Sequence, residues 1–243
     1  FCKGANWIPA DALPARQTEA VYARLLTDAA EAHMNMIRVW GGGQYEPDCF
    51  YDLCDRLGIL VWQDFMFACA LYPAEEWFLA EVRREVEYQV KRLASRACIA
   101  LFCGNNENVG ALGWHDEVKS DPARYRRDYE TLNDQTVGAA VKRLAPGVPW
   151  WPSSPSAGEK DYTDAFSRDG AGDMHYWHVW HKGEPFSSYY NVVPRFCSEF
   201  GFQSFPSLST VATFTPPDQF DVTSAVMRHH QRSPAGNRVI TEM

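Results

Sequence analysis

Short apolar runs alternate along this chain with segments in which apolar residues recur every three or four positions. A helix is predicted from about Thr18 to His33, for example, because Val21, Leu25 and Ala29 repeat at every fourth position. The runs that predict strands are 1–7, 34–40, 59–64, 99–102, 148–152, 174–177 and 195–201. Alternation of this kind is typical of a parallel β-sheet covered by helices.

Further helices are predicted at 47–57, 74–96, 123–144 and 218–230. Thr18 is a candidate cap for the first helix, and Pro47 and Gly58 bracket the second in the expected order. The stretch 110–122, which contains Trp114, is predicted to be a loop, and 238–241 is a candidate start for an eighth strand.

Polar residues stand at the ends of several predicted strands, namely Asp64, Glu107, His175 and Glu199. In α/β proteins the carboxyl ends of parallel strands form the edge at which ligands bind. The pattern predicts an α/β fold of the (β/α)8 TIM-barrel type with its site at this edge. Because an eighth strand–helix unit is not evident, we expect the chain to stop before the barrel closes.

Two glutamates occur in similar surroundings. Glu107 lies in Cys103-Gly104-Asn105-Asn106-Glu107-Asn108, directly after the apolar run 99–102, and Glu199 is the one carboxylate in 196–201. On a barrel, strands far apart in sequence deliver side chains to one mouth. Retaining glycosidases need two carboxyl groups ~5–5.5 Å apart, so we predict that Glu107 and Glu199 face each other and cleave a glycosidic bond. A single strand-end glutamate is more often a cap or an ion-pair partner; the repetition favours catalysis.

Composition excludes several other classes of protein. Hydrophobic residues make up 46% of the chain and charged residues 22%, which is typical of a globular protein. The net charge of −8 argues against nucleic acid or an anionic membrane as a partner. The longest apolar stretch, 57–72, is interrupted by Gln63 and Asp64, so no membrane span is predicted. A soluble protein is expected, while the compartment and the oligomeric state stay open.

Cysteines and histidines do not predict a metal site. The seven cysteines are odd in number and form no CxxC pair, so we interpret them as free thiols, which mildly favours a reducing compartment. His175, His178 and His181 would not share one face of a strand. The glycines at 41–43 lack the residues of a phosphate loop. No cofactor is expected, and Arg38 is interpreted as an ion-pair partner of a strand-end carboxylate.

Several motifs together resemble the catalytic barrel of glycoside hydrolase family 2, and within that family the β-mannosidases. The similarity extends from the first residue to beyond residue 230, and the motifs occur in the same order. They are Lys3–Pro9 (KGANWIP), Ile37–Gly43 (IRVWGGG), Trp62–Phe65 (WQDF), Gly104–Asn108 (GNNEN) and Ser198–Gly201 (SEFG). The Asn-Asn-Glu-Asn form is more similar to mannosidases than to the galactosidases or glucuronidases of the family.

The resemblance implies specific roles. Glu107 would be the acid/base, Glu199 the nucleophile of a retaining reaction, and Asn106 a contact of the sugar 2-hydroxyl. The remaining residues implied to bind substrate are Trp40 and Trp114 and, as looser transfers, Asp64, His175, Tyr176 and Trp177.

The resemblance also implies a domain and a substrate. Residues 1–243 would form one catalytic barrel domain, incomplete and without the β-sandwich domains that flank it in family members. The substrate would be a β-mannoside oligosaccharide or glycoconjugate, cleaved at its terminal non-reducing mannose. Two alternatives stay open: another exo-hydrolase of the family, such as a β-glucosaminidase or a β-galactosidase-like enzyme, and a non-catalytic carbohydrate-binding barrel.

Overall fold

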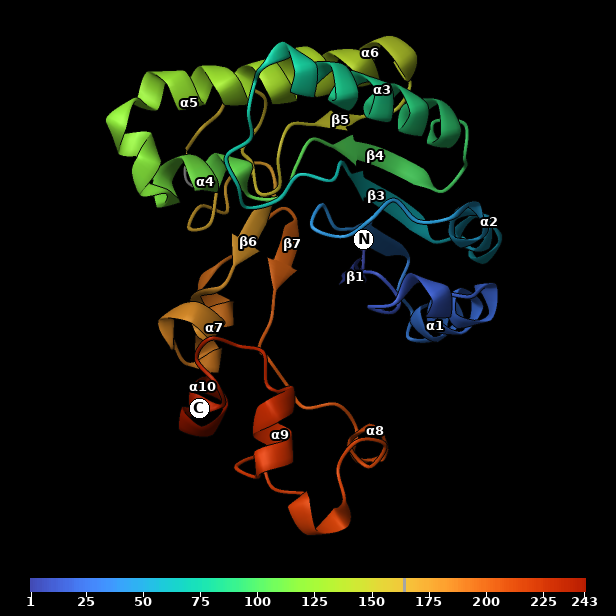
Figure 1. Ribbon diagram of the computed structural model, residues 1–243, viewed down its shortest axis with the longest axis vertical. Coiled ribbons are helices and arrows are strands. Elements are labelled where there is room, and N and C mark those ends of the chain that lie inside the picture. Colours follow the sequence, from blue (N-terminus) through green and yellow to red (C-terminus); the bar gives the residue numbers. More distant parts are fainter. Residues whose placement is uncertain (164) are drawn as a thin grey trace.

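Parallel strands form two sheets in the computed structural model, which describes residues 1–163 and 165–243 (Figure 1). The larger sheet has the order β1-β2-β3-β4-β5, and the smaller one pairs β6 with β7. The strands are β1 (Gly4–Trp7), β2 (Met36–Val39), β3 (Leu60–Asp64), β4 (Ile99–Cys103), β5 (Trp150–Trp151), β6 (Met174–Tyr176) and β7 (Cys197–Phe200). Every pairing is parallel, so the predicted α/β fold with a parallel sheet is confirmed.

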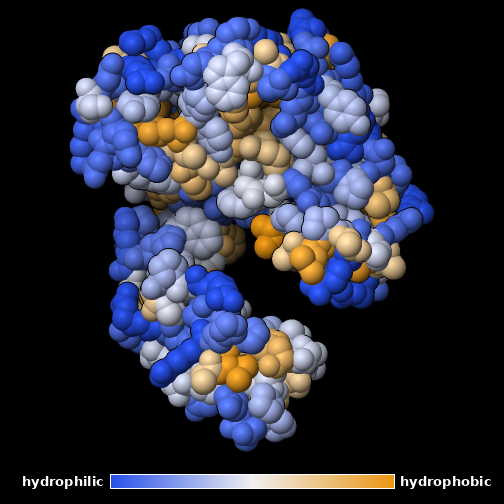
Figure 2. Space-filling view, in the orientation of Figure 1, coloured by the Kyte–Doolittle hydropathy of each residue, from blue (hydrophilic) through white to orange (hydrophobic). Residues whose placement is uncertain are grey.

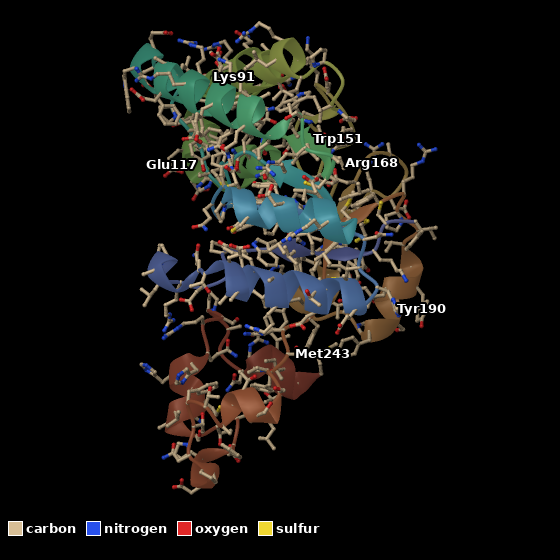
Figure 3. All side chains as sticks on the ribbon, turned by 90° about the vertical axis from the view of Figure 1, so that its right-hand side faces the viewer. Lys91, Glu117, Trp151, Arg168, Tyr190 and Met243 are labelled. Carbon is tan, nitrogen blue, oxygen red and sulfur yellow. The ribbon has the colours of Figure 1, made fainter. Side chains whose placement is uncertain are left out.

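Helices cover the outer face of the larger sheet. In the side view α1, α2 and α3 lie next to one another, in blue, light blue and teal (Figure 3). The helices are α1 (Glu19–Glu31), α2 (Asp48–Leu57), α3 (Glu76–Leu93), α4 (Asn108–Trp114), α5 (Pro122–Tyr129), a π-helix (Glu130–Gly138), α6 (Ala139–Leu144), α7 (His178–Lys182), α8 (Leu208–Val211), α9 (Ala225–His230) and α10 (Arg238–Glu242). Short 3-10 turns occupy 14–16, 116–120, 186–191 and 217–219.

The hydrophobic core lies between the larger sheet and these helices. Ile37 and Val39 of β2 point into it, together with Val86 and Val90 of α3. Each such side chain contributes roughly 1.5–3 kcal/mol by its burial. Successive strand residues face opposite sides, so Arg38, between Ile37 and Val39, points to the inner face of the sheet. The core therefore fixes which strand residues reach the site.

Helix ends follow the sequence signals only in part. Gly58 adopts a left-handed conformation (φ 69°) just past α2, and its N–H donates to Cys54 O, as the Pro47–Gly58 pattern predicts. Thr18 is the residue before α1, but its side chain makes no capping hydrogen bond.

Three predicted elements are wrong or incomplete. The stretch predicted to be a loop at 110–122 includes most of α4 and a 3-10 turn. The predicted helix at 123–144 is interrupted by the π-helix. Residues 238–241, the candidate eighth strand, lie in α10, because no sheet neighbour is present there to favour their β-branched side chains as a strand.

The strands do not form one continuous barrel sheet. Pro152 and Pro155 follow β5, and a proline lacks the N–H that a sheet ladder requires. Beyond them Asp173 N donates to Ser156 O (3.1 Å), which links the approach to β6 with the larger sheet. On the other side a groove of about 700 Å³ separates the edges of β1 and β7.

The chain after β7 stands apart from this body. Figures 1 and 2 show α8, α9 and α10 below the strands, with open space between this segment and the larger sheet. None of the helices in the described residues has both the length and the apolar character that a membrane span needs.

Candidate active site

A cleft of about 720 Å³ opens at the carboxyl ends of the strands from both sheets. Both predicted catalytic glutamates line it, although they come from different sheets. The remaining lining side chains are Trp40, Cys69, Asn106, Trp114, Phe166, Ser167, His175, Trp177, His178, His181 and Lys182. The location is the edge at which α/β proteins bind ligands.

The exit of β4 is held by its packing against the outer layer. A Cβ atom on Gly104 would lie 2.2 Å from Asn133 Oδ1 and 2.4 Å from Pro152 O, so this close approach requires glycine. The next residue, Asn105, donates from Nδ2 to Asn133 Oδ1 (2.9 Å) and accepts at Oδ1 from Asn108 N (3.1 Å). Asn133 lies in the π-helix, a form often found near functional sites.

Glu107 has a left-handed backbone conformation (φ 59°), which is uncommon for a residue with a side chain. Such a conformation costs about 1–3 kcal/mol and persists only where neighbours enforce it. Here Glu107 N donates to Ser154 O (2.8 Å), and Ala111 N, in α4, donates to Glu107 O (2.9 Å). These bonds direct the carboxyl group into the cleft rather than along the strand.

Glu107 and Glu199 face each other across a buried histidine. His175 Nδ1 lies 2.7 Å from Glu107 Oε1 and 3.4 Å from Glu199 Oε2. The three ligand-type atoms, one from each residue, lie within 4.8 Å of one another. His175 is completely buried, whereas both carboxyl groups keep a small exposed area toward the cleft. The structure thus brings the two glutamates into one site.

Arg38 connects the residues on the inner face of the sheet. Its guanidinium group, almost completely buried, donates to Glu199 Oε1 (2.6 Å), Asp64 Oδ2 (2.8 Å) and Asn106 Oδ1 (2.8 Å). The predicted ion pair between Arg38 and a strand-end carboxylate is confirmed. Because arginine only donates, the amide oxygen of Asn106 must face Arg38, and its NH2 group is left to face the cleft.

The two glutamates differ in their electrostatic surroundings. Burial, followed by the nearby charge of Glu199, raises the pKa of Glu107 to about 7. Burial also raises the pKa of Glu199, but the Arg38 charge and hydrogen bonds from Arg38 and Trp177 oppose that shift. Like charges resist joint ionisation. The negative charge is therefore favoured on Glu199, and the proton on Glu107.

We expect the variant Arg38→Met to lose about 3–5 kcal/mol of the free energy of unfolding, because Asp64 and Glu199 would remain as buried, unpaired carboxylates. Urea unfolding measures this loss. The matched control is Arg24→Met, since Arg24 makes only an exposed pair with Asp28, which is worth well under about 1 kcal/mol. Equal stability of the two variants would contradict the central role of Arg38.

Three tryptophans predicted to bind substrate line the cleft. Trp40 follows β2, Trp114 ends α4, and Trp177 follows β6. Trp114 is about half exposed (51%), and Trp177 Nε1 donates to Glu199 Oε2 (3.2 Å). Asn106 Nδ2 donates to Cys69 Sγ (3.3 Å) at the cleft wall.

Two of the predicted substrate contacts do not reach the cleft. Asp64 is fully buried, and its carboxylate accepts hydrogen bonds from Arg38, Trp62 Nε1 and Gly41 N. Tyr176 points to the opposite side of β6 from its neighbours, because strand residues alternate, and its OH donates to Ser188 O (3.0 Å). Both residues support the site from behind.

Metal binding needs separate consideration, because Glu107, His175 and Glu199 have the residue types of a ligand set. Tetrahedral zinc ligands at ~2.0–2.1 Å from the ion are roughly 3.3 Å apart. The 2.7 Å between His175 Nδ1 and Glu107 Oε1 is shorter than that and is typical of a hydrogen bond with a proton between the atoms. We interpret the contact as a hydrogen bond. His178 instead contacts Lys182 Nζ (2.9 Å).

Cys69 is a cleft residue that sequence reasoning missed. It follows β3 with a left-handed backbone (φ 52°), and its thiol lies 3.5 Å from Glu107 Oε2. Burial and the charge of Glu107 raise its pKa to about 11, so the thiol stays neutral. Its position depends on the loop after β3, for which the sequence carries no motif.

Several curated proteins are similar to this chain in sequence. No model of a known protein family matches the chain. The β-mannosidase of Bos taurus is 42% identical over 243 residues, and β-mannosidase B of Thermothelomyces thermophilus is 37% identical over 261 residues. Each match covers 98% of this chain but only 28% and 29% of the relative. The chain thus spans less than a third of the length of these relatives.

Solved structures give the same result. The β-D-mannosidase of Dictyoglomus thermophilum matches all of this chain and 29% of its own, with a TM-score of 0.89 and 42% identity. A Bacteroides uniformis β-glucuronidase, at 20% identity, 79% of this chain and 22% of its own, shares the fold alone (TM-score 0.58).

Over nearly its whole length the chain is similar to a portion of the β-mannosidases, a class of glycoside hydrolase. Two carboxyl groups close together are the arrangement with which such enzymes cleave glycosidic bonds.

Proposed function

We propose that residues 1–243 form the catalytic barrel domain of a retaining, exo-acting β-mannosidase of glycoside hydrolase family 2. The observation that carries the proposal is the pair of carboxyl groups, whose oxygens on Glu107 and Glu199 lie within 4.8 Å. Retaining glycosidases hold the two groups ~5–5.5 Å apart, whereas inverting enzymes need ~6.5–9.5 Å for an intervening water. The similarity to β-mannosidases supports the choice of sugar.

In the first step Glu199 is the nucleophile. One of its oxygens forms a bond to the anomeric carbon while the glycosidic C–O bond breaks, and Glu107 gives its proton to the departing oxygen. Arg38 and Trp177 hold Glu199 ionised and oriented before the attack. The raised pKa of Glu107, about 7, keeps its proton available near neutral pH.

In the second step Glu107 acts as a general base instead of a general acid. Its carboxylate takes a proton from water, the water oxygen attacks the anomeric carbon, and the bond to Glu199 breaks. Two inversions give net retention of configuration. The proton returns to Glu107, so the enzyme regains its starting state.

Recognition of mannose is assigned to Asn106 and the tryptophans. Arg38 fixes the amide of Asn106 so that Nδ2 is presented to the cleft, where it would donate to the axial 2-hydroxyl. Trp40 and Trp114 offer aromatic faces to the sugar ring. Removal of the terminal non-reducing residue is proposed from the resemblance to exo-acting members of the family.

The barrel itself is part of the proposal. The facing edges of β1 and β7 border a groove of about 700 Å³, and near the site the bond from Asn6 Nδ2 to Ser198 O (3.0 Å) crosses it. A parallel strand in this groove would pair with both edges and would be the eighth strand around the site. Burying the edges would also remove an aggregation hazard.

A panel of p-nitrophenyl glycosides tests the function, measured on the longest natural polypeptide that contains this chain. We expect kcat/KM for the β-mannoside to exceed that for the β-glucosaminide and the β-galactoside by at least about tenfold, the value of one lost hydroxyl contact of ~1.4 kcal/mol. A preference for either of the other sugars would contradict the mannosidase proposal. Absence of turnover on every glycoside, with retained sugar binding, would favour a non-catalytic barrel.

A further inference from the structure

A buried chain of hydrogen bonds extends from the cleft to the far side of His175. His175 Nε2 lies 2.9 Å from Ser154 Oγ, which in turn lies 2.6 Å from Asp173 Oδ2. The three residues are almost completely buried, at 0%, 0% and 2% exposure. Neither Ser154 nor Asp173 lines the cleft, so neither has a part in the reaction described above.

The hydrogen bonds to Asp173 indicate that its carboxyl group carries no proton. Oδ1 accepts from Trp151 Nε1 (2.7 Å) and Ser156 N (2.9 Å), both of which can only donate. Oδ2 accepts from the hydroxyl groups of Ser154 and Ser198. Burial raises the pKa of Asp173, and these four donors oppose that shift. A carboxylate that accepts four hydrogen bonds is satisfied as the ionised form.

The direction of the remaining bonds follows by elimination. The single hydroxyl proton of Ser154 is directed at Asp173, so Ser154 Oγ must accept the hydrogen bond from His175 Nε2–H. Burial, followed by the charge of Arg38, holds the pKa of His175 well below its usual value, so the ring is neutral and carries one proton. That proton is on Nε2, which leaves a lone pair on Nδ1, facing Glu107 Oε1 at 2.7 Å.

We propose that Asp173 and Ser154 fix the tautomer of His175, so that Nδ1 accepts a hydrogen bond from the protonated carboxyl group of Glu107. The inference rests on the proposed function, in which Glu107 is the general acid. Asp173, Ser154 and His175 are positioning residues: they keep the acid loaded by stabilising its neutral form. No group other than Glu107 gains or loses a proton in this arrangement.

Among the charged groups around Glu107 and His175, Glu199 also favours a proton on Glu107, but by repulsion and not by a directed hydrogen bond. Glu199 Oε2, from β7, lies 3.4 Å from Nδ1 and repels a second negative charge, whereas Arg38, from β2, favours one. The Cys69 thiol stays neutral. The charge of Asp64 acts on Glu199. Burial raises the pKa of the buried Cys103 thiol and of the partly buried Cys197 thiol. To burial and the repulsion by Glu199, the His175 lone pair adds a directed acceptor for the proton of Glu107.

The isosteric variant Asp173→Asn separates this inference from a merely structural role. Trp151 and Ser156 N would hold the amide oxygen, so the NH2 group would face Ser154 and Ser198. Ser154 would then accept from Asn and donate to His175 Nε2. The ring proton would move to Nδ1 and donate to Glu107, which favours the carboxylate.

Nitrogen-15 NMR of histidine-labelled protein reads the tautomer without any need for activity, with His175→Gln to assign the signal. We expect the proton on Nε2 in the unchanged protein and on Nδ1 in Asp173→Asn. In Ser154→Ala, the second variant, we expect a mixture of both tautomers. A proton on Nδ1 in the unchanged protein, or one unaltered tautomer in both variants, would overturn the inference.

The pH profile of kcat/KM supplies the second measurement. Activity requires protonated Glu107, so it falls as pH rises through the pKa of that group, about 7. Asp173→Asn is expected to move this alkaline limb down by about one pH unit, which is a roughly tenfold loss above it. The matched control Ser198→Ala removes a donor from Asp173 but not the Ser154–His175 contact, so its limb should stay in place. A correct tautomer without glycosidase activity would refute the proposed function alone.

Discussion

Replacing Glu199 with alanine is expected to lower kcat for an aryl β-mannoside by on the order of 10⁴–10⁶. The variant has no atom that can attack the anomeric carbon, so the covalent route is lost. It also leaves Arg38 without the 2.6 Å contact to Glu199 Oε1, although Asp64 still neutralises the guanidinium group. The folded state should therefore survive, and the loss should be confined to turnover.

Azide provides the positive test of this role. The anion can enter the space that the side chain leaves and attack from the same face, which yields an α-mannosyl azide. Glu46→Ala is the matched control, because Glu46 is also buried but accepts hydrogen bonds from Trp7 and Tyr22 away from the cleft. A Glu199→Ala protein with kcat within tenfold of the unchanged protein would exclude Glu199 as nucleophile.

The variant Glu107→Ala is expected to lower kcat/KM by about 10²–10⁴ for substrates whose leaving group needs a proton. The reason is the loss of the neutral carboxyl group whose pKa burial raises to about 7. For a dinitrophenyl mannoside, whose leaving group departs without protonation, the rate of the first step should fall far less. Comparing kcat/KM for the two leaving groups in one variant gives an internal control.

Azide distinguishes the two glutamates by stereochemistry. In Glu107→Ala the covalent intermediate still forms on Glu199, and azide then attacks from the opposite face to give a β-mannosyl azide. Formation of the α-product in this variant, or an equal loss for both leaving groups, would contradict the assignment of Glu107 as the acid/base.

Much of the fold could be predicted because buried elements leave a periodic trace. Val82, Val86 and Val90 of α3 repeat at the spacing of a helix and all lie in the core. Strand β3 is buried on both faces after its first residue and begins as an apolar run. Exposed or short elements lack this trace, so α4 was interpreted as a loop. Residues 238–241 have strand-forming side chains, but they form a helix because no neighbouring strand pairs with them.

The site was predictable at the strand ends and not beyond them. Glu107 and Glu199 could be found because a carboxylate after an apolar run is conspicuous. The resemblance implies Tyr176 as a substrate contact, but strand residues alternate, so Tyr176 points away from the cleft that its neighbour His175 lines. Ser154 and Asp173 meet across separate segments through side-chain hydrogen bonds, which no spacing rule describes.

The packing of Gly104 against Asn133 and Pro152 has a consequence for redesign of the site. The orientation of the Glu107 carboxyl group depends on the contact between Gly104 and the outer π-helix, which does not line the cleft. Substitutions in that helix would therefore displace the carboxyl group. The cleft rim at α7, which carries His181 and Lys182, is not part of this contact. Laboratory evolution of new leaving-group preferences should therefore find its tolerated changes along that rim.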